Sequence, residues 1–216
     1  MKVLFLCGDK WHPSEVLIRG LSDLAPDEIS FDFVEDAKDI LTPDMLKNYP
    51  VIINAKYDQL TAANNAGWFD AGVTEVMPSD LRAYIEAGGG FISLHSGNSF
   101  FKDDNPDYID LVGNYFVQHP PRCPVTVTPT GSHPITEGIL PFTERDEHYQ
   151  IVVVAKDADV FLESTSETGG KQVAGYTRLI GDGRLCVLTP GHIAAVLRNG
   201  SFRAILKNAI AWAAKA

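Results

Sequence analysis

Short apolar runs separated by amphipathic stretches dominate the first half of the chain. Nearly unbroken apolar runs lie at residues 3–7, 51–53 and 91–94. Runs of this length without polar alternation are typical of strands that are buried on both faces, as in a parallel sheet. We therefore expect buried parallel strands at these three places.

Between these runs the apolar residues follow a helical spacing. Ser14, Thr42 and Ser79 are candidate N-caps of three helices, the last of which covers residues 80–87 and stops at the glycines 88–90. Strand and helix alternate in this way through the first half of the chain. The alternation predicts βαβ units and an α/β fold with a doubly wound, mostly parallel, flavodoxin-like sheet.

Proline and glycine interrupt the second half more often, so loops and short strands are expected there. Residues 171–179 and 184–189 flank a Gly-Asp-Gly turn at 181–183, which predicts an antiparallel C-terminal hairpin. Ser201 is a candidate cap for a closing helix. The apolar stripe of that helix consists of Phe202, Ile205, Leu206, Ala209, Ile210 and Trp212. No repeat or linker divides the chain, so one domain over residues 1–216 is predicted.

The amino-acid composition of the chain limits the kinds of molecule that it is expected to bind. The 18 Lys and Arg residues stand against 28 Asp and Glu, a formal net charge of -10. This charge disfavours nucleic-acid phosphates and anionic membrane surfaces as partners. The apolar run at residues 3–7 is too short to span a membrane. The three cysteines lack the paired spacing of a disulfide scaffold, so the expected location is a reducing cytoplasm.

Ligands of doubly wound sheets bind beyond the carboxyl ends of the strands, which makes the residues after each strand the first candidates for a site. In this chain those positions hold many polar and aromatic side chains. They are Asp9, Trp11, His12, Tyr57, Asp58, His95, Ser96, Asn98, Gly191 and His192. Three of the six histidines are among them.

His95 lies at the centre of the most informative local motif. The sequence Gly90-Phe-Ile-Ser-Leu-His95-Ser-Gly97 resembles a strand that enters a sharp turn, with small residues two positions on either side of His95. Nucleophile elbows need such residues because the turn is strained and crowded. Here the elbow carries an imidazole. The alternative is a histidine that only caps the end of the strand through a ring hydrogen bond.

Two further segments carry candidate chemistry. His192 follows a strand that ends in Pro-Gly, and two imidazoles at neighbouring strand ends could share a metal or a substrate. Asp146, Glu147, His148 and Tyr149 are consecutive, and in an extended chain Glu147 and Tyr149 share one side. A solvated acidic loop is the alternative for this segment.

Other motifs are assigned or excluded on simpler grounds. His119 is assigned to the site and His133, which precedes a proline, to a turn. Trp68 and Phe69 either stack on a sugar or pack in the core. The chain has no phosphate-binding loop and no HExxH motif, and its Gly-Gly-Gly tract precedes a strand instead of following one. None of the cysteines lies in a setting that activates a thiolate.

Five motifs occur in order: Gly88-Gly-Gly-Phe-Ile-Ser-Leu-His95, His133-Pro-Ile-Thr-Glu-Gly138, Asp146-Glu-His-Tyr149, Gly181-Asp-Gly-Arg184 and Pro190-Gly-His192. Together with the closing Ala-Ile-Ala-Trp-Ala helix, they resemble the ThuA-like (trehalose utilisation) family over nearly the whole chain. That family is similar in fold to class I glutamine amidotransferases, whose elbow carries a cysteine and whose later strand end carries a His-x-Glu pair.

The amidotransferase triad is incomplete here. Carried over residue by residue, the cysteine falls on His95, the histidine on His192 and the glutamate on Ala194. Imidazole at the elbow cannot form the thioester that glutamine hydrolysis needs, and Ala194 cannot orient His192. The resemblance therefore implies no glutaminase activity. The family pattern has leucine where this chain has His148, so no shared role is expected for His148.

The resemblance implies a role in the utilisation of trehalose or a related disaccharide. A ketone in a sugar ring acidifies the neighbouring C–H, and a histidine or glutamate can move that proton. We expect an enzyme that acts on such an oxidised sugar as an isomerase, lyase or hydrolase. The expected catalytic residues are His95, His192 and Glu147. The expected substrate-binding residues are His12, Tyr57, Asp58, His119 and Tyr149.

Two alternatives stay open. A divalent metal (zinc, manganese or iron) could assist the reaction, with candidate ligands His12, His95, His119, Glu147 and His192. The rival function is a non-catalytic sugar-binding or assembly module on the same fold. An enzyme should bring at least three of the named polar residues into one pocket. The expected partner is a small-molecule sugar, not nucleic acid or membrane, and assembly into a homo-oligomer is left open.

Overall fold

The computed structural model describes residues 1–35, 37–57 and 68–215. The strands are β1 (Lys2–Cys7), β2 (Ser30–Val34), β3 (Val51–Ala55), β4 (Gly90–Leu94), β5 (Asn114–Gln118), β6 (Cys123–Pro129), β7 (Phe142–Asp146), β8 (Gln150–Val153), β9 (Asp159–Ser166), β10 (Gly170–Ile180) and β11 (Gly183–Leu188). The helices are α1 (Ser14–Leu21), α2 (Ala37–Ile40), α3 (Pro43–Leu46), α4 (Pro78–Glu86), α5 (Pro106–Val112), α6 (Ala194–Arg198) and α7 (Gly200–Ala213), with 3-10 turns η1 (His95–Asn98) and η2 (Pro134–Thr136).

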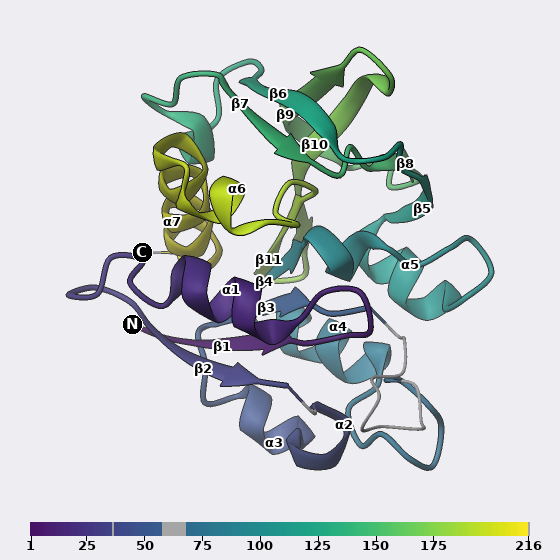
Figure 1. Ribbon diagram of the computed structural model, residues 1–216. Coiled ribbons are helices and arrows are strands. Elements are labelled where there is room, and N and C mark those ends of the chain that lie inside the picture. The colour runs from purple at the N-terminus through teal and green to yellow at the C-terminus, as the bar shows by residue number, and fades with distance from the viewer. Residues whose placement is uncertain (36, 58–67, 216) are drawn as a thin grey trace.

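Within the described residues, nine strands form one sheet in the order β2-β1-β3-β4-β11-β10-β9-β6-β7 (Figure 1). The first five of these strands are parallel, and the remaining four continue the sheet in antiparallel fashion. Strands β5 and β8 form a separate antiparallel ribbon. The predicted α/β class and doubly wound parallel sheet are confirmed, as is the hairpin of β10 and β11.

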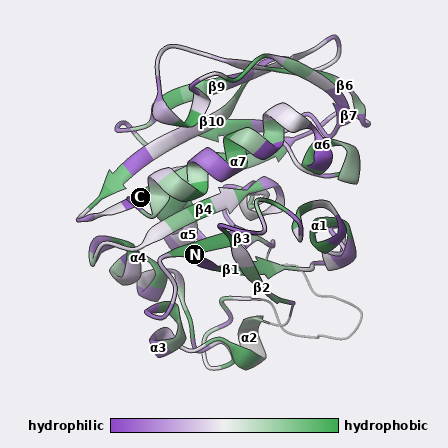
Figure 2. Ribbon diagram, turned by 90° about the vertical axis from the view of Figure 1, so that its left-hand side faces the viewer, coloured by the Kyte–Doolittle hydropathy of each residue, from purple (hydrophilic) through white to green (hydrophobic). Residues whose placement is uncertain are grey.

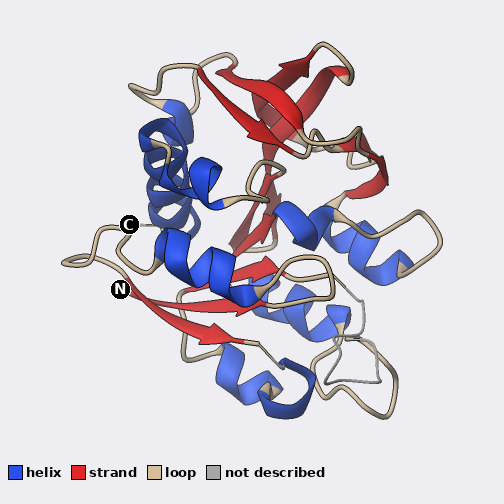
Figure 3. Cartoon of the chain, viewed as in Figure 1, coloured by secondary structure: helices blue, strands red, loops and turns tan. Residues whose placement is uncertain are grey.

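Alternate side chains of the parallel strands enter two cores on opposite faces of the sheet. In β1, Val3 and Phe5 belong to the core that includes α1, α6 and α7, whereas Leu4 and Leu6 belong to the core with α3, α4 and α5. Figure 3 shows helices on both sides of these strands, and Figure 2 shows the hydrophobic colour on the central strands β1 and β3. Burial on both faces is the reason for the unbroken apolar runs in the sequence.

The proline-rich second half contributes more sheet than its sequence predicts. Strand β6 contains Pro124 and Pro129 and still pairs with β7 on one side and β9 on the other. Both prolines lie near the ends of the strand, where a missing N–H costs little. The segment thus extends the main sheet instead of forming loops around it.

The starts of three helices differ from those predicted. Thr42 caps α3 as expected. Ser14, Ser79 and Ser201 lie inside the first turn of α1, α4 and α7 instead. Asn199 caps α7, because its side-chain oxygen accepts the N–H of Ser201 at 3.0 Å. A proline precedes each of the other two serines, and its fixed φ suits the first helical position or the one before it. None of the described helices is long and apolar enough to cross a bilayer.

His95 follows β4 on a sharp turn that has the features of an elbow. Its φ of 42° lies in the left-handed region, which residues other than glycine seldom adopt. At Gly97 a side chain would collide with the carbonyl oxygen of Asn54. The Ser93 hydroxyl donates to the side-chain oxygen of Asn98 at 2.7 Å, and the Asn98 amide donates to the Ser93 carbonyl at 3.1 Å. The small residues on both sides of His95 therefore have the crowding role that the motif predicts.

We predict that Gly97→Ala lowers the free energy of unfolding by about 1–3 kcal/mol, because the added methyl group overpacks the elbow. Gly200→Ala is the matched control, since a Cβ there meets no atom within 4 Å. Urea unfolding followed by circular dichroism measures both variants. Equal stability of the two would show that the elbow is not crowded.

Candidate functional site

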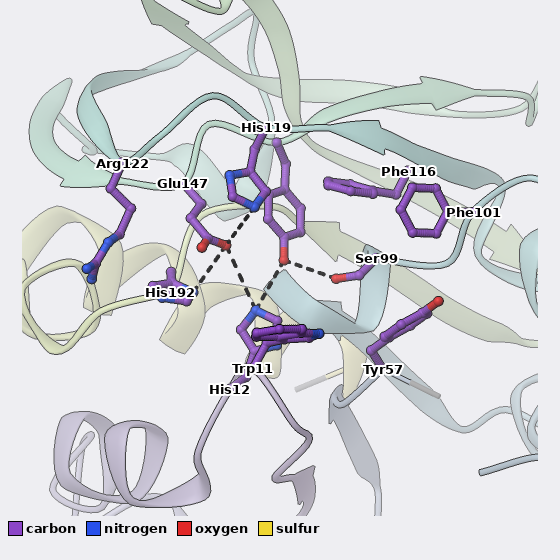
Figure 4. Close-up of a pocket in the computed structure, with 11 residues that line it drawn as sticks. Trp11, His12, Tyr57, Ser99, Phe101, Phe116, His119, Arg122, Glu147 and His192 are labelled. Atoms are coloured by element: carbon purple, nitrogen blue, oxygen red, sulfur yellow. Dashed lines mark hydrogen bonds and ion pairs between the residues drawn. The ribbon is translucent and has the colours of Figure 1, made fainter. Parts of the chain in front are cut away.

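A cavity of about 450 Å³ opens at the carboxyl ends of the parallel strands. Polar groups and aromatic rings share its lining (Figure 4). The lining residues that matter most for the chemistry are Trp11, His12, His119, Glu147, Tyr149 and His192. Most of the residues expected at the site therefore meet in one pocket.

One carboxylate oxygen, Oε2 of Glu147, faces four imidazoles. It lies 3.2 Å from Nδ1 of His192, 3.5 Å from Nε2 of His95, 3.6 Å from Nε2 of His119 and 3.9 Å from Nε2 of His12. Figure 4 shows Glu147 pointing towards His12, His119 and His192. Burial alone would raise the pKa of Glu147, but the imidazoles that surround its carboxylate, His12 most of all, hold it well below its usual range.

The topology explains why these side chains converge. His12, His95 and His192 follow β1, β4 and β11, whose carboxyl ends lie at the same edge of the parallel sheet. Glu147 lies between β7 and β8, in the antiparallel part of the chain. Sites of doubly wound folds form at this edge because the loops that follow the strands meet there. Glu147 reaches the same place from the other half of the molecule.

His12 is held by Asp9. Its Nδ1 lies 2.8 and 3.0 Å from the two carboxylate oxygens of Asp9, which also accept the backbone N–H groups of Trp11, His12 and Tyr57. Burial lowers the pKa of His12, but the hydrogen bond to Asp9 and the nearby carboxylate of Glu147 outweigh it and raise the pKa to about 9. The sequence motif did not reveal this pairing, because it depends on the turn after β1.

His95 lies beneath the pocket and does not line it, with only 2% of its surface exposed. Its Nδ1 lies 2.7 Å from the carbonyl oxygen of Thr189. A carbonyl only accepts hydrogen bonds, so Nδ1 carries the proton of the neutral ring and Nε2 presents its lone pair. Burial lowers the pKa of His95, which favours this neutral form. The ring stacks on Tyr149 with centroids 4.3 Å apart.

Successive side chains of residues 146–149 point to opposite sides, as predicted for an extended chain. Glu147 and Tyr149 line the pocket. The buried Asp146 accepts the backbone N–H groups of Gly191 at 2.9 Å and His192 at 3.1 Å, and burial raises its pKa. His148 is also buried and contacts the hydroxyls of serines 164 and 166 at 2.9 and 2.7 Å. The alternative of a solvated acidic loop is therefore wrong.

The remaining residues singled out from the sequence divide into four groups. Tyr57 and His119 line the cavity, and Asp58 lies outside the described residues. His133 caps η2 by accepting the N–H of Ile135, as the turn assignment predicts. Trp68 and its neighbour Phe69 are buried in the core and stack on each other, so they do not form a sugar platform.

Four lining residues were not expected from the sequence. They are Ser99, Phe101, Phe116 and Arg122. Each lies within a few positions of a predicted site residue, so adjacency to His95 or His119 was the available signal.

Two cysteines lie in settings that disfavour the thiolate. Burial raises the pKa of the Cys7 thiol to about 12 and also raises the pKa of Cys186. Neither cysteine is therefore an activated nucleophile.

The fold and the elbow define a flavodoxin-like, class I glutamine amidotransferase-like α/β protein with an imidazole at the elbow. A model of the ThuA family, described as "Trehalose utilisation", matches residues 2–213. The chain belongs to this family. No curated protein sequence matches it.

Solved structures with the same fold include two proteins described as putative ThuA-like. The one from Bacteroides uniformis has 21% identity and a TM-score of 0.72, covering 99% of this chain and 91% of that one. The one from Parabacteroides merdae has 16% identity and a TM-score of 0.77, covering 99% and 90%. A β-galactosidase from Rahnella sp. R3 has 14% identity and a TM-score of 0.68, covering 97% of this chain and 30% of that enzyme.

We predict that Asp9→Asn lowers the pKa of His12 from about 9, because burial remains while the carboxylate charge is lost. A pH titration of the histidine ring signals by NMR, in metal-free protein, measures the change. Asp32→Asn is the control, since Asp32 pairs with Lys2 at the amino end of β1, whereas the histidines follow the carboxyl ends of the strands. An unchanged titration of His12 would contradict the assignment of Asp9.

Proposed function

We propose that this ThuA-family protein acts in the utilisation of trehalose or a related disaccharide, as an enzyme on an oxidised (keto) form of the sugar. The observation that carries the proposal is the cluster of imidazoles around Glu147 at the floor of a sugar-sized cavity. Such clusters serve proton transfer or metal binding. Glutaminase activity is not part of the proposal, because the elbow has no thiol.

The chemistry follows from the acidity of a C–H next to a ketone. A neutral imidazole takes the proton from carbon, and the electron pair of the C–H bond moves to the ketone oxygen to form an enolate. In an isomerisation, the hydroxyl on the deprotonated carbon passes its proton to the enolate oxygen and becomes the new ketone, while the former ketone carbon takes a proton from the imidazolium. In an elimination, the enolate re-forms the ketone and expels an oxygen substituent from the next carbon, and the imidazolium protonates the leaving oxygen. If His12, His95, Glu147 and His192 held a divalent cation, it would supply a positive charge that favours electron density on the ketone oxygen.

The residues have different access to such a substrate. His192 and Glu147 line the cavity, so His192 is the proposed proton acceptor and Glu147 the proton carrier or metal ligand. His95 is buried beneath them and acts through Glu147. His12, Tyr57, His119 and Tyr149 are proposed to bind the sugar hydroxyls.

Aromatic side chains at the pocket support a sugar as ligand. Trp11 and Phe101 line the cavity and are exposed to 59% and 46%. Sugar rings combine apolar C–H faces with polar edges, so they pack on aromatic rings while their hydroxyls contact polar groups. The volume of about 450 Å³ lies in the usual range for small-molecule pockets.

The second candidate is a non-catalytic sugar-binding or assembly module. It is favoured by the match to the β-galactosidase, where a domain of this fold accounts for only 30% of the chain. The convergence of His12, Glu147 and His192 in one pocket favours the enzyme. The expected cytoplasmic location and assembly as a homo-oligomer stay predictions.

We predict that the protein turns over a 3-keto disaccharide and that Glu147→Gln and His192→Ala each reduce kcat by at least about 100-fold. Chromatography coupled to mass spectrometry detects isomerised or cleaved product. Glu137→Gln, an exposed carboxylate outside the cavity, is the control. Unchanged turnover in both site variants, or no turnover of any keto disaccharide, would exclude the proposed chemistry.

We predict that Trp11→Ala weakens binding of the disaccharide by about 10-fold through loss of ring stacking. Titration calorimetry with the unoxidised disaccharide measures this without turnover. Leu179→Ala, an apolar side chain with 70% exposure and no part in the cavity, is the control. Equal affinities of the two variants would remove Trp11 from the binding site.

A further inference from the structure

Four potential ligand atoms gather at the floor of the pocket. They belong to His12, His95, Glu147 and His192, and all lie within 4.8 Å of one another. Ligands of a tetrahedral ion with bonds of about 2.0–2.2 Å lie roughly 3.3–3.6 Å apart. Three imidazoles face Glu147 Oε2 at 3.2, 3.5 and 3.9 Å, so small side-chain adjustments bring all four atoms to one ion.

Two ring nitrogens of this group lack a hydrogen-bond partner. Among the described residues, Nε2 of His95 and Nδ1 of His192 are buried without one. In His95 the other nitrogen is already used by the Thr189 carbonyl, so the lone pair of Nε2 faces the Glu147 carboxylate. Two electron-rich atoms at this distance repel each other unless a cation lies between them. Buried polar atoms without partners are uncommon and point to a missing ion or proton.

The surroundings of the four residues are those of metal ligands. Nδ1 of His12 is bound by the Asp9 carboxylate, and Nδ1 of His95 by the Thr189 carbonyl. Both contacts hold the ring through Nδ1 and aim Nε2 at Glu147, where Nε2 is able to bind a metal ion in place of a proton. The Asp146 carboxylate accepts the backbone N–H of His192 at 3.1 Å and so fixes the position of that residue. Such second contacts fix the tautomer and orientation of histidines that bind metals.

We propose that His12, His95, His192 and Glu147 bind a single divalent first-row transition-metal ion, such as zinc, manganese or iron. Three imidazoles and one carboxylate match this class, whereas calcium and magnesium favour all-oxygen ligands. Because His12, Glu147 and His192 line the cavity while His95 lies below, a bound ion would lie at the floor of the cavity, where a fifth ligand could reach it from the cavity side. A ketone oxygen there would become a ligand of the ion.

His119 is excluded from the ligand set, which narrows the five candidates from the sequence to four. Its Nε2 lies 3.6 Å from Glu147, but its side chain is 33% exposed and its Nδ1 contacts the Pro120 carbonyl at 2.8 Å. It is not part of the group whose ligand atoms lie within 4.8 Å of one another. His119→Ala is therefore the matched control for the histidine ligands.

The test is metal binding by the tag-free full chain after chelator treatment, without any sugar. Titration with Co²⁺ is expected to give visible d–d absorption that saturates at one equivalent and disappears when Zn²⁺ is added. Glu147→Gln and His192→Ala are expected to weaken Zn²⁺ binding by at least about 100-fold, and Asp9→Asn by about 10- to 100-fold. His119→Ala keeps the affinity of the unchanged protein. Circular dichroism establishes that each variant is folded.

Two results would overturn the metal site. One is the absence of stoichiometric Co²⁺ or Zn²⁺ binding, which would leave a proton shared between the imidazoles and Glu147 as the cation of the cluster. The other is unchanged affinity in folded Glu147→Gln and His192→Ala. The proposal deepens the metal-assisted form of the proposed function, in which His192 is a ligand of the ion and not the proton acceptor. Metal binding and sugar turnover are measured separately. A metal-binding protein that ignores keto disaccharides would refute only the sugar chemistry.

Discussion

The carboxylate of Glu147 joins the two halves of this molecule. The parallel half supplies imidazoles from the ends of β1, β4 and β11, and the antiparallel half supplies the anion that they face. A buried carboxylate is costly unless cationic or hydrogen-bonding groups surround it, and three or four imidazoles clustered without an anion would repel one another once charged. The buried carboxylate and the clustered imidazoles are therefore each stabilised by the presence of the other.

The turn after β4 has the strained backbone of an elbow and carries an imidazole there. A positive φ at a non-glycine residue costs of order 1–3 kcal/mol and persists when the surroundings fix it. Here the fixing groups are Gly97 and the buried Asn98 amide. The strained position presents the imidazole of His95 from below the pocket. Position 194 is an alanine, and the carboxylate that contacts His192 belongs to Glu147 in a distant segment.

The pocket combines a polar floor with an aromatic rim, and the two have separate origins in the fold. The floor is built from residues at strand ends, whose positions the sheet determines. The rim comes from loops, among them the one that carries Trp11 after β1 and the one that carries Phe101 after η1. Loops vary more easily than strand ends. The rim is therefore the part of the site where selectivity among ligands is expected to reside.

The sequence alone determined the parallel half of the fold and named His12, His95, Glu147 and His192, because buried strands leave unbroken apolar runs and sites follow their carboxyl ends. It did not reveal that the proline-rich second half extends the sheet, since antiparallel pairing depends on partners far away in the chain. Only the tertiary structure decided which histidines meet one carboxylate oxygen, that His95 lies beneath the cavity and that Asp9 holds His12. Those facts depend on distances between strand ends and loops, which spacing along the chain does not encode.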